Sequence, residues 1–150
     1  MIKAFIASLA LSTLCIPQVQ ASETFTEADL LKYHESIGGR VYVDSDLCKE
    51  TGALGIQQGI AVHICTEPHK GDTAEMADTI RHEMWHMVQV CNGGPLTSDK
   101  VMAIGEAYAK GWTGEGYDED VWHLEAEAHF VASSFTAAEI KNGIDNYCFE

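Results

Sequence analysis

One segment, from Thr73 to Val90, constrains the fold more than any other part of the chain. Its apolar residues recur at steps of three and four and predict a helix that buries one face: Met76, Ile80, Met84, Met87 and Val88. Its polar residues fall on the opposite face: Glu75, Asp78, His82, His86 and Gln89. Asp72 or Thr73 would cap the start, and the Gly93-Gly94-Pro95 run would end it. We therefore expect a helix over residues 73–90 with two histidines on the face turned away from its core.

The pattern before this helix predicts an α+β fold. Residues 27–37 follow a polar capping pair and are typical of a first helix. Residues 40–44 and 56–65 are rich in branched and aromatic side chains, which predicts two adjacent antiparallel strands. We expect this small antiparallel sheet to pack against the helix over residues 73–90.

Three further helices are predicted in the C-terminal half. The first covers residues 100–110. Acidic residues at 118–120 would stabilise the positive amino end of a second helix. A capping box at Thr136 and Glu139 predicts a short last helix, which Gly143 would close.

The first 21 residues have the pattern of a secretory signal peptide. Lys3 supplies a positive start, residues 4–16 form an apolar run, and small residues lead up to a cleavage site after Ala21. Residues 22–150 have the length of one domain. No later stretch approaches the roughly 18 apolar residues of a spanning helix. We therefore expect a secreted or periplasmic protein without a stable membrane anchor.

Four cysteines remain after the predicted signal peptide, and an even number favours two disulfides in an exported chain. Of the three pairings, we favour Cys48 with Cys65, which bracket the second predicted strand segment, and Cys91 with Cys148, which would tie down the C-terminal segment. Cysteine ligands to zinc are disfavoured because the chain has no Cys-x-x-Cys spacing. A lipoprotein anchored at Cys15 is also disfavoured, since a bulky leucine precedes that cysteine.

The charge of the chain argues against one class of partner. Without the signal peptide it has 8 Lys and Arg against 23 Asp and Glu, a formal net charge of −15 with His neutral. Such a chain cannot neutralise many phosphates, so we expect no nucleic-acid partner. The acidity otherwise favours solubility and says little about the fold.

The polar face of the helix over residues 73–90 contains the motif His82-Glu83-Met84-Trp85-His86. Helix positions i and i+4 lie one above the other about 6 Å apart, so the two imidazoles can bind one zinc ion. Glu83 projects beside them and would reach a zinc-bound water without binding the metal itself. We therefore expect His82 and His86 as zinc ligands and Glu83 as the general base of a hydrolase.

A catalytic zinc site has three protein ligands and one open position, so a further ligand is expected downstream. Glu125 and Glu127, in the helix predicted after residue 120, are the best candidates. At 100° per residue, they lie about 70° and about 90° from the centre of that helix's apolar stripe, on opposite flanks. The angles therefore do not decide between Glu125 and Glu127 as the third ligand.

With these residues, the chain resembles the gluzincins, zinc peptidases in which a His-Glu-x-x-His helix is followed by a ligand glutamate on a second helix. In thermolysin-like, HtpX-like and ImmA/IrrE-like members, a small residue stands three positions after that glutamate or an acid or amide stands four after it. Ala128 has the first relation to Glu125, which favours Glu125 over Glu127. His129 departs from the acid or amide that hydrogen-bonds to a zinc histidine. A metzincin is excluded, because no histidine follows His86 within reach.

Peptide hydrolysis passes through an oxyanion, which many sites stabilise with a neutral tyrosine or a protonated histidine. His123 and Tyr117 are the first candidates because they flank the proposed glutamate helix, ahead of Tyr108 and His129. The strand over residues 60–64 could also be a sheet edge to which an extended peptide adds. An ordinary core strand is the simpler interpretation.

Taken together, these features predict an exported zinc peptidase with one Zn²⁺ ion and a peptide or protein substrate. Two alternatives stay open. The first is a zinc-binding protein without catalysis, in which a protein group fills the fourth metal position. The second is a disulfide-stapled interaction domain with histidines on its surface, which would contain no zinc.

Overall fold

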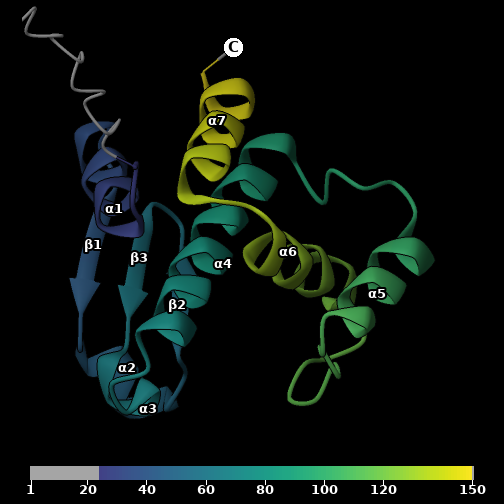
Figure 1. Ribbon diagram of the computed structural model, residues 1–150, viewed down its shortest axis with the longest axis horizontal. Coiled ribbons are helices and arrows are strands. Elements are labelled where there is room, and N and C mark those ends of the chain that lie inside the picture. Colours follow the sequence, from purple (N-terminus) through teal and green to yellow (C-terminus); the bar gives the residue numbers. More distant parts are fainter. Residues whose placement is uncertain (1–23, 150) are drawn as a thin grey trace, which may run out of the picture.

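The computed structural model describes residues 24–149, and the predicted signal peptide over residues 1–21 lies outside them. The fold is α+β, as predicted, with a three-stranded sheet on one side and mostly helices on the other (Figure 1). None of the helices within the described residues combines the length and the hydrophobicity needed to cross a membrane.

Helix α4, Thr73–Asn92, runs through the middle of the fold (Figure 1). The Asp72 side chain caps its start by accepting from two backbone N–H groups, and Gly93 ends it in the left-handed conformation, with φ at 77°. The predicted helix is therefore confirmed and extends two residues beyond its expected end. Ile80, Met84 and Val88 are buried on its core face, as the periodicity predicts.

Most of the N-terminal elements are short. They are, in chain order, α1 Glu27–Ser36, β1 Arg40–Val43, α2 Asp46–Thr51, β2 Gly55–Gln58, β3 Ala61–Ile64 and α3 Thr66–His69. Helix α1 begins at the predicted capping box and ends one residue before its expected end. Helices α2 and α3 have only 6 and 4 residues, too few for a periodic signal, and the sequence did not predict them.

The sheet is mixed, so the predicted antiparallel arrangement is only partly correct. The central strand is β3, which pairs parallel with β1 and antiparallel with β2. The segment predicted as one strand over residues 56–65 forms two strands, because Gly59, with φ at 62°, allows the chain to reverse. The core strand favoured for residues 60–64 is confirmed and the alternative of a free edge is wrong, since β3 is paired on both sides.

The C-terminal helices are α5 Lys100–Ala109, α6 Trp122–Ser134 and α7 Ala137–Cys148. Helix α6 begins after the acidic residues 118–120, which lie in the preceding loop. Helix α7 does not close at Gly143 but continues for five residues beyond it. A Cβ at Gly143 would lie 2.9 Å from the Trp85 ring, so glycine at this position allows α7 to pack closely on α4.

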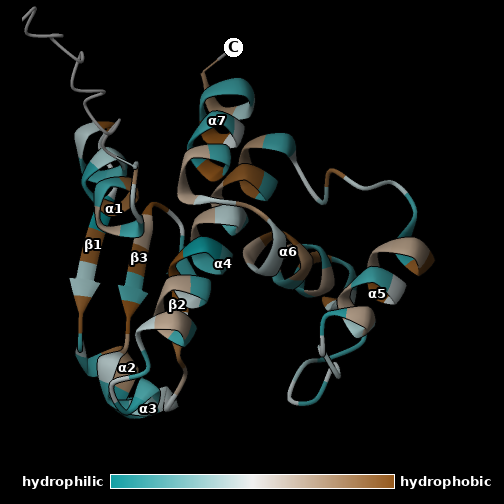
Figure 2. Cartoon of the chain, in the orientation of Figure 1, coloured by the Kyte–Doolittle hydropathy of each residue, from teal (hydrophilic) through white to brown (hydrophobic). Residues whose placement is uncertain are grey.

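The main hydrophobic core lies where the sheet, α1, α4, α6 and α7 meet, and Figure 2 shows hydrophobic residues in β3 and in parts of α4 and α7. Its fully buried members include Leu30, Val62, Met84, Val88, Ile140 and Ile144. Both predicted disulfides are formed. The Cys48–Cys65 bridge joins α2 to the end of β3, and the Cys91–Cys148 bridge joins the last turns of α4 and α7.

Candidate metal centre

The two histidines of the motif lie one helical turn apart on α4 and converge on one point. Their ring centroids are 4.7 Å apart in an edge-to-face arrangement, and the Nε2 atoms of His82 and His86 are 3.0 Å apart. Both side chains are about five-sixths buried, at 16% and 15% exposure. The i, i+4 spacing therefore brings two imidazole nitrogens together at a partly desolvated position.

Helix α6 brings a carboxylate to the same point. One oxygen of Glu125 lies 3.2 Å from Nε2 of His82, and the other lies 3.6 Å from Nε2 of His86. Burial alone would raise the pKa of Glu125, but hydrogen bonds with His82 and His86 outweigh it and lower this pKa to about 2. Burial opposes protonation of His86, yet contact with Glu125 raises the pKa of that histidine. Glu125 and His86 thus stabilise one another's charged forms.

The spacing of the donor atoms suits a small tetrahedral cation. An ion with ligands at about 2.0–2.1 Å places neighbouring ligand atoms about 3.3 Å apart. The two Nε2 atoms are 3.0 Å apart, and each lies 3.2 or 3.6 Å from a different oxygen of the Glu125 carboxylate. The three residues are the one group of possible metal ligands within residues 24–149. Two imidazoles and one carboxylate can therefore bind a metal at this position without a large rearrangement.

Glu83 lies beside the three ligands and is not one of them. Its side chain is 7% exposed, and burial raises its pKa although His82 and His86 act to lower it. The backbone of Gln57 in β2 also acts to lower this pKa. Strand β2 comes this close because residue 55 is glycine: a Cβ there would lie 2.7 Å from Cγ of Glu83. The edge strand and α4 together position the proposed base.

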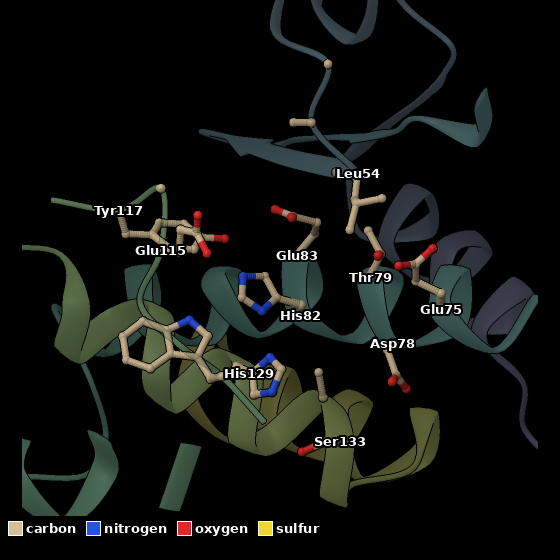
Figure 3. Close-up of a pocket in the computed structure, with 16 residues that line it drawn as sticks. Leu54, Glu75, Asp78, Thr79, His82, Glu83, Glu115, Tyr117, His129 and Ser133 are labelled. Atoms are coloured by element: carbon tan, nitrogen blue, oxygen red, sulfur yellow. The ribbon is translucent and has the colours of Figure 1, made fainter. Parts of the chain in front are cut away.

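A cleft of about 800 Å³ opens beside the candidate ligands, with His82 and Glu83 among its lining residues. Figure 3 shows His82 and Glu83 between Tyr117 and Glu115 on one side and Leu54, Thr79 and Glu75 on the other. Burial and the carboxylates of Glu125 and Glu83 raise the pKa of Tyr117 to about 12. Its hydroxyl therefore stays protonated at neutral pH, as the prediction of an oxyanion donor requires.

Glu127, the alternative third ligand, does not reach the cluster. It is 3% exposed and accepts hydrogen bonds from four N–H groups: Trp85 Nε1, Gln89 Nε2, Leu96 N and Thr97 N. Burial would raise the pKa of Glu127, but these donors lower it. A carboxylate whose oxygens are engaged in this way stabilises the α4–α6 contact, so the geometry selects Glu125 as the candidate ligand.

The other predicted site residues lie in different places. His123 does not line the cleft, since a step of two residues before Glu125 turns it about 200° around α6. Its Nε2 is buried without a hydrogen-bond partner among the described residues. His129 does line the cleft, but its Nε2 lies 3.3 Å from the carbonyl oxygen of Lys110. Tyr108 is 45% exposed and packs on Trp112, which lines the cleft, but Tyr108 is not itself a lining residue.

Sequence reasoning missed the partner of His86. It placed Gln89 on the polar face of the helix, but Gln89 is 2% exposed, and its Oε1 lies 2.7 Å from Nδ1 of His86. Gln89 therefore has the contact that the gluzincin resemblance assigned to the position of His129. Gln89 stands three residues after His86, and i and i+3 side chains are neighbours on a helix. This spacing was the sequence signal that could have predicted the contact.

Comparison with known proteins leaves the chemistry of this centre unassigned. No curated protein and no solved structure matches the chain. One family model matches residues 21–149, which are nearly the whole chain. The chain belongs to the family described as a domain of unknown function, DUF8637.

Proposed function

We propose that this protein is an exported zinc peptidase whose centre is formed by His82, His86 and Glu125. The observation that carries the proposal is the convergence of these three side chains, from two helices, at 3.0–3.6 Å. His82, together with Glu83, also lines a cleft. Two imidazoles and one carboxylate are a donor set that suits zinc. The two disulfides are typical of an exported chain, which supports the location.

Zinc, when bound, would supply a Lewis acid that polarises a carbonyl and lowers the pKa of a coordinated water. The remaining steps belong to side chains. Glu83, buried with a raised pKa, accepts a proton from the attacking water and delivers it to the leaving amine. Tyr117, whose hydroxyl is protonated at neutral pH, donates to the oxyanion that forms on the scissile carbonyl. The cleft accommodates the flanking residues of a peptide.

The test begins with the metal content of the protein, purified with both disulfides formed, and with its hydrolysis of fluorescein-labelled casein. We expect one zinc per chain and measurable release of labelled peptides. Glu83→Gln should keep the zinc and lower turnover by about 10²–10⁴-fold, because it removes general-base catalysis and leaves the ligands in place. Glu35→Gln, the same substitution at an exposed carboxylate on α1, should change neither property.

The result would decide between the proposal and its two rivals. Zinc without casein hydrolysis, and without hydrolysis of a mixed peptide library, would favour a binding protein. Absence of zinc at neutral pH would favour an interaction domain. For export, we expect the amino terminus of the secreted protein to begin at Ser22, which N-terminal sequencing can check.

A further inference from the structure

Gln89 is a buried amide between the two helices that carry the candidate ligands. Its Nε2 lies 3.0 Å from the backbone oxygen of Leu124 and 3.0 Å from Oε1 of Glu127. Its Oε1 lies 2.7 Å from Nδ1 of His86. At 2% exposure it has little contact with solvent, so these three contacts account for its polar atoms.

Two of these contacts determine which way the amide points. The backbone oxygen of Leu124 can only accept a hydrogen bond. The Glu127 carboxylate already accepts from the N–H groups of Trp85, Leu96 and Thr97, so it also acts as an acceptor here. If the amide were turned over, its oxygen would face two acceptor oxygens in a buried environment and would itself lack a donor. The NH₂ group of Gln89 must therefore face Leu124 and Glu127.

The orientation of the amide in turn determines the tautomer of His86. Since the Gln89 oxygen faces Nδ1 of His86 at 2.7 Å, the hydrogen bond forms only when Nδ1 carries the proton. In the neutral imidazole the other nitrogen, Nε2, then has a free lone pair. Nε2 is the atom that lies 3.0 Å from His82 and 3.6 Å from Glu125.

Gln89 also couples the two helices at the position of the third ligand. Leu124, whose oxygen accepts from Gln89, immediately precedes Glu125 on α6. One side chain therefore contacts His86 on α4 and the residue next to Glu125 on α6. A shift of α6 relative to α4 would break this contact and move Glu125 away from the histidines.

We propose that Gln89 is the positioning residue of the metal centre, which holds His86 with Nε2 free to bind metal and keeps Glu125 in register with it. The part that concerns metal affinity rests on the proposed function. The part that concerns the tautomer does not, because it applies to the metal-free protein as well.

The experiment combines two measurements on the wild type and on Gln89→Met, which keeps the volume and removes the amide. Nitrogen-15 NMR of the metal-free protein, at a pH where His86 is neutral, reports which ring nitrogen carries the proton. We expect Nδ1–H in the wild type and a mixture of both tautomers in Gln89→Met. Competition with a chelator measures zinc affinity, which should fall by about 10–100-fold, as for other outer partners of metal-binding histidines.

Two further variants separate positioning from a purely structural role. Trp85→Phe removes a different donor to Glu127, at 2.9 Å, and leaves the Gln89–His86 contact in place. It should lower stability without changing the tautomer or the zinc affinity. The double change Gln89→Glu with Glu127→Gln reverses the hydrogen bond between the two side chains and returns an acceptor to Nδ1, but it removes the donor to the Leu124 oxygen. It should restore part of the affinity that Gln89→Met loses.

Each outcome has a distinct meaning. Nε2–H in the wild type, or full zinc affinity in Gln89→Met, would overturn the positioning role. Equal loss of affinity in Trp85→Phe and Gln89→Met would also overturn it. A wild type that shows Nδ1–H and binds no zinc would contradict the metal centre and leave the assigned tautomer correct.

Discussion

The contact between α4 and α6 has two sides that use the same residue types in opposite ways. On the cleft side, His82, His86 and Glu125 bring two nitrogens and two oxygens together, and no backbone N–H within residues 24–149 donates to these atoms. On the core side, Gln89 and Glu127 form hydrogen bonds with Trp85, Leu124, Leu96 and Thr97. Glu125 and Glu127 are only two positions apart on one helix.

The cleft-side cluster lacks hydrogen-bond donors for its close nitrogen and oxygen atoms, whereas the core-side network pairs each of its donors with an acceptor. On the core side, every contact pairs a donor with an acceptor, as expected of a buried network that stabilises a fold. On the cleft side, the close atoms are mainly lone-pair bearers, and only protons or a cation can hold them together. The cluster that needs a proton or a cation is therefore the one on the side of the cleft.

The largest expected effect comes from exchanging the two glutamates for glutamine one at a time. Glu125→Gln should lower zinc affinity by more than the 10–100-fold expected for an outer partner, because it removes a charged ligand. Glu127→Gln should reduce it less. Chelator competition on both variants measures the difference, and equal losses would remove the distinction between the two sides.

The position of Glu83 can be tested without changing any polar group. Gly55→Ala would place a Cβ 2.7 Å from Cγ of Glu83 and 2.7 Å from Cγ2 of Thr79. We expect hydrolysis to fall by about 100-fold, since a displacement of about 1 Å at a reacting group has effects of that size. Zinc content should stay at the wild-type level. The control is Gly105→Ala on α5, where the added methyl group meets nothing within 4 Å and activity should be unchanged.

Stability should respond most on the core side. Glu127→Gln leaves one carbonyl oxygen and an NH₂ group facing four N–H donors, so we expect a loss of about 2–3 kcal/mol in the free energy of unfolding. Urea denaturation measures it. Glu115→Gln, at an exposed carboxylate in the loop before α6, should leave the urea midpoint unchanged.

The smallest effect is a dependence on pH. The pKa of Glu127 in the folded protein is below its ordinary value of 4.5, because the N–H donors outweigh the effect of burial. A depressed folded pKa stabilises the fold above the unfolded pKa, and this stabilisation is lost as pH falls through the folded value. The stability difference between wild type and Glu127→Gln should therefore be constant above pH 4.5 and shrink below it. A difference that grows on acidification would contradict the role assigned to Glu127.

The sequence predicted the helices better than the sheet, for a physical reason. Helix α4 has twenty residues of clear period and a cap at each end, which are local signals. Strands β1 and β3 have four residues each, and the same alternation suits parallel and antiparallel pairing. Gly143 looked like a helix end because its role is tertiary, in the close contact with Trp85.

The candidate site also has a part that local sequence predicts and a part that depends on how the helices pack. His82, Glu83 and His86 belong to one short motif, so local geometry was sufficient to place them together. The choice between Glu125 and Glu127 depends on how α6 is rotated against α4, which the sequence pattern leaves open. Gln89 was placed on an exposed face because a polar side chain on a helix suits both solvent and a buried network.

The two disulfides differ in how much of the chain must be present before each can form. Cys48 and Cys65 are 17 residues apart and can pair soon after β3 is made, whereas Cys91 must wait for a partner 57 residues further on. Because synthesis proceeds from the amino end, the histidines of α4 exist before Glu125 and before the bridge that joins α4 to α7. Assembly of the centre is therefore a late event, and a chain interrupted before α6 would expose both histidines without their third partner.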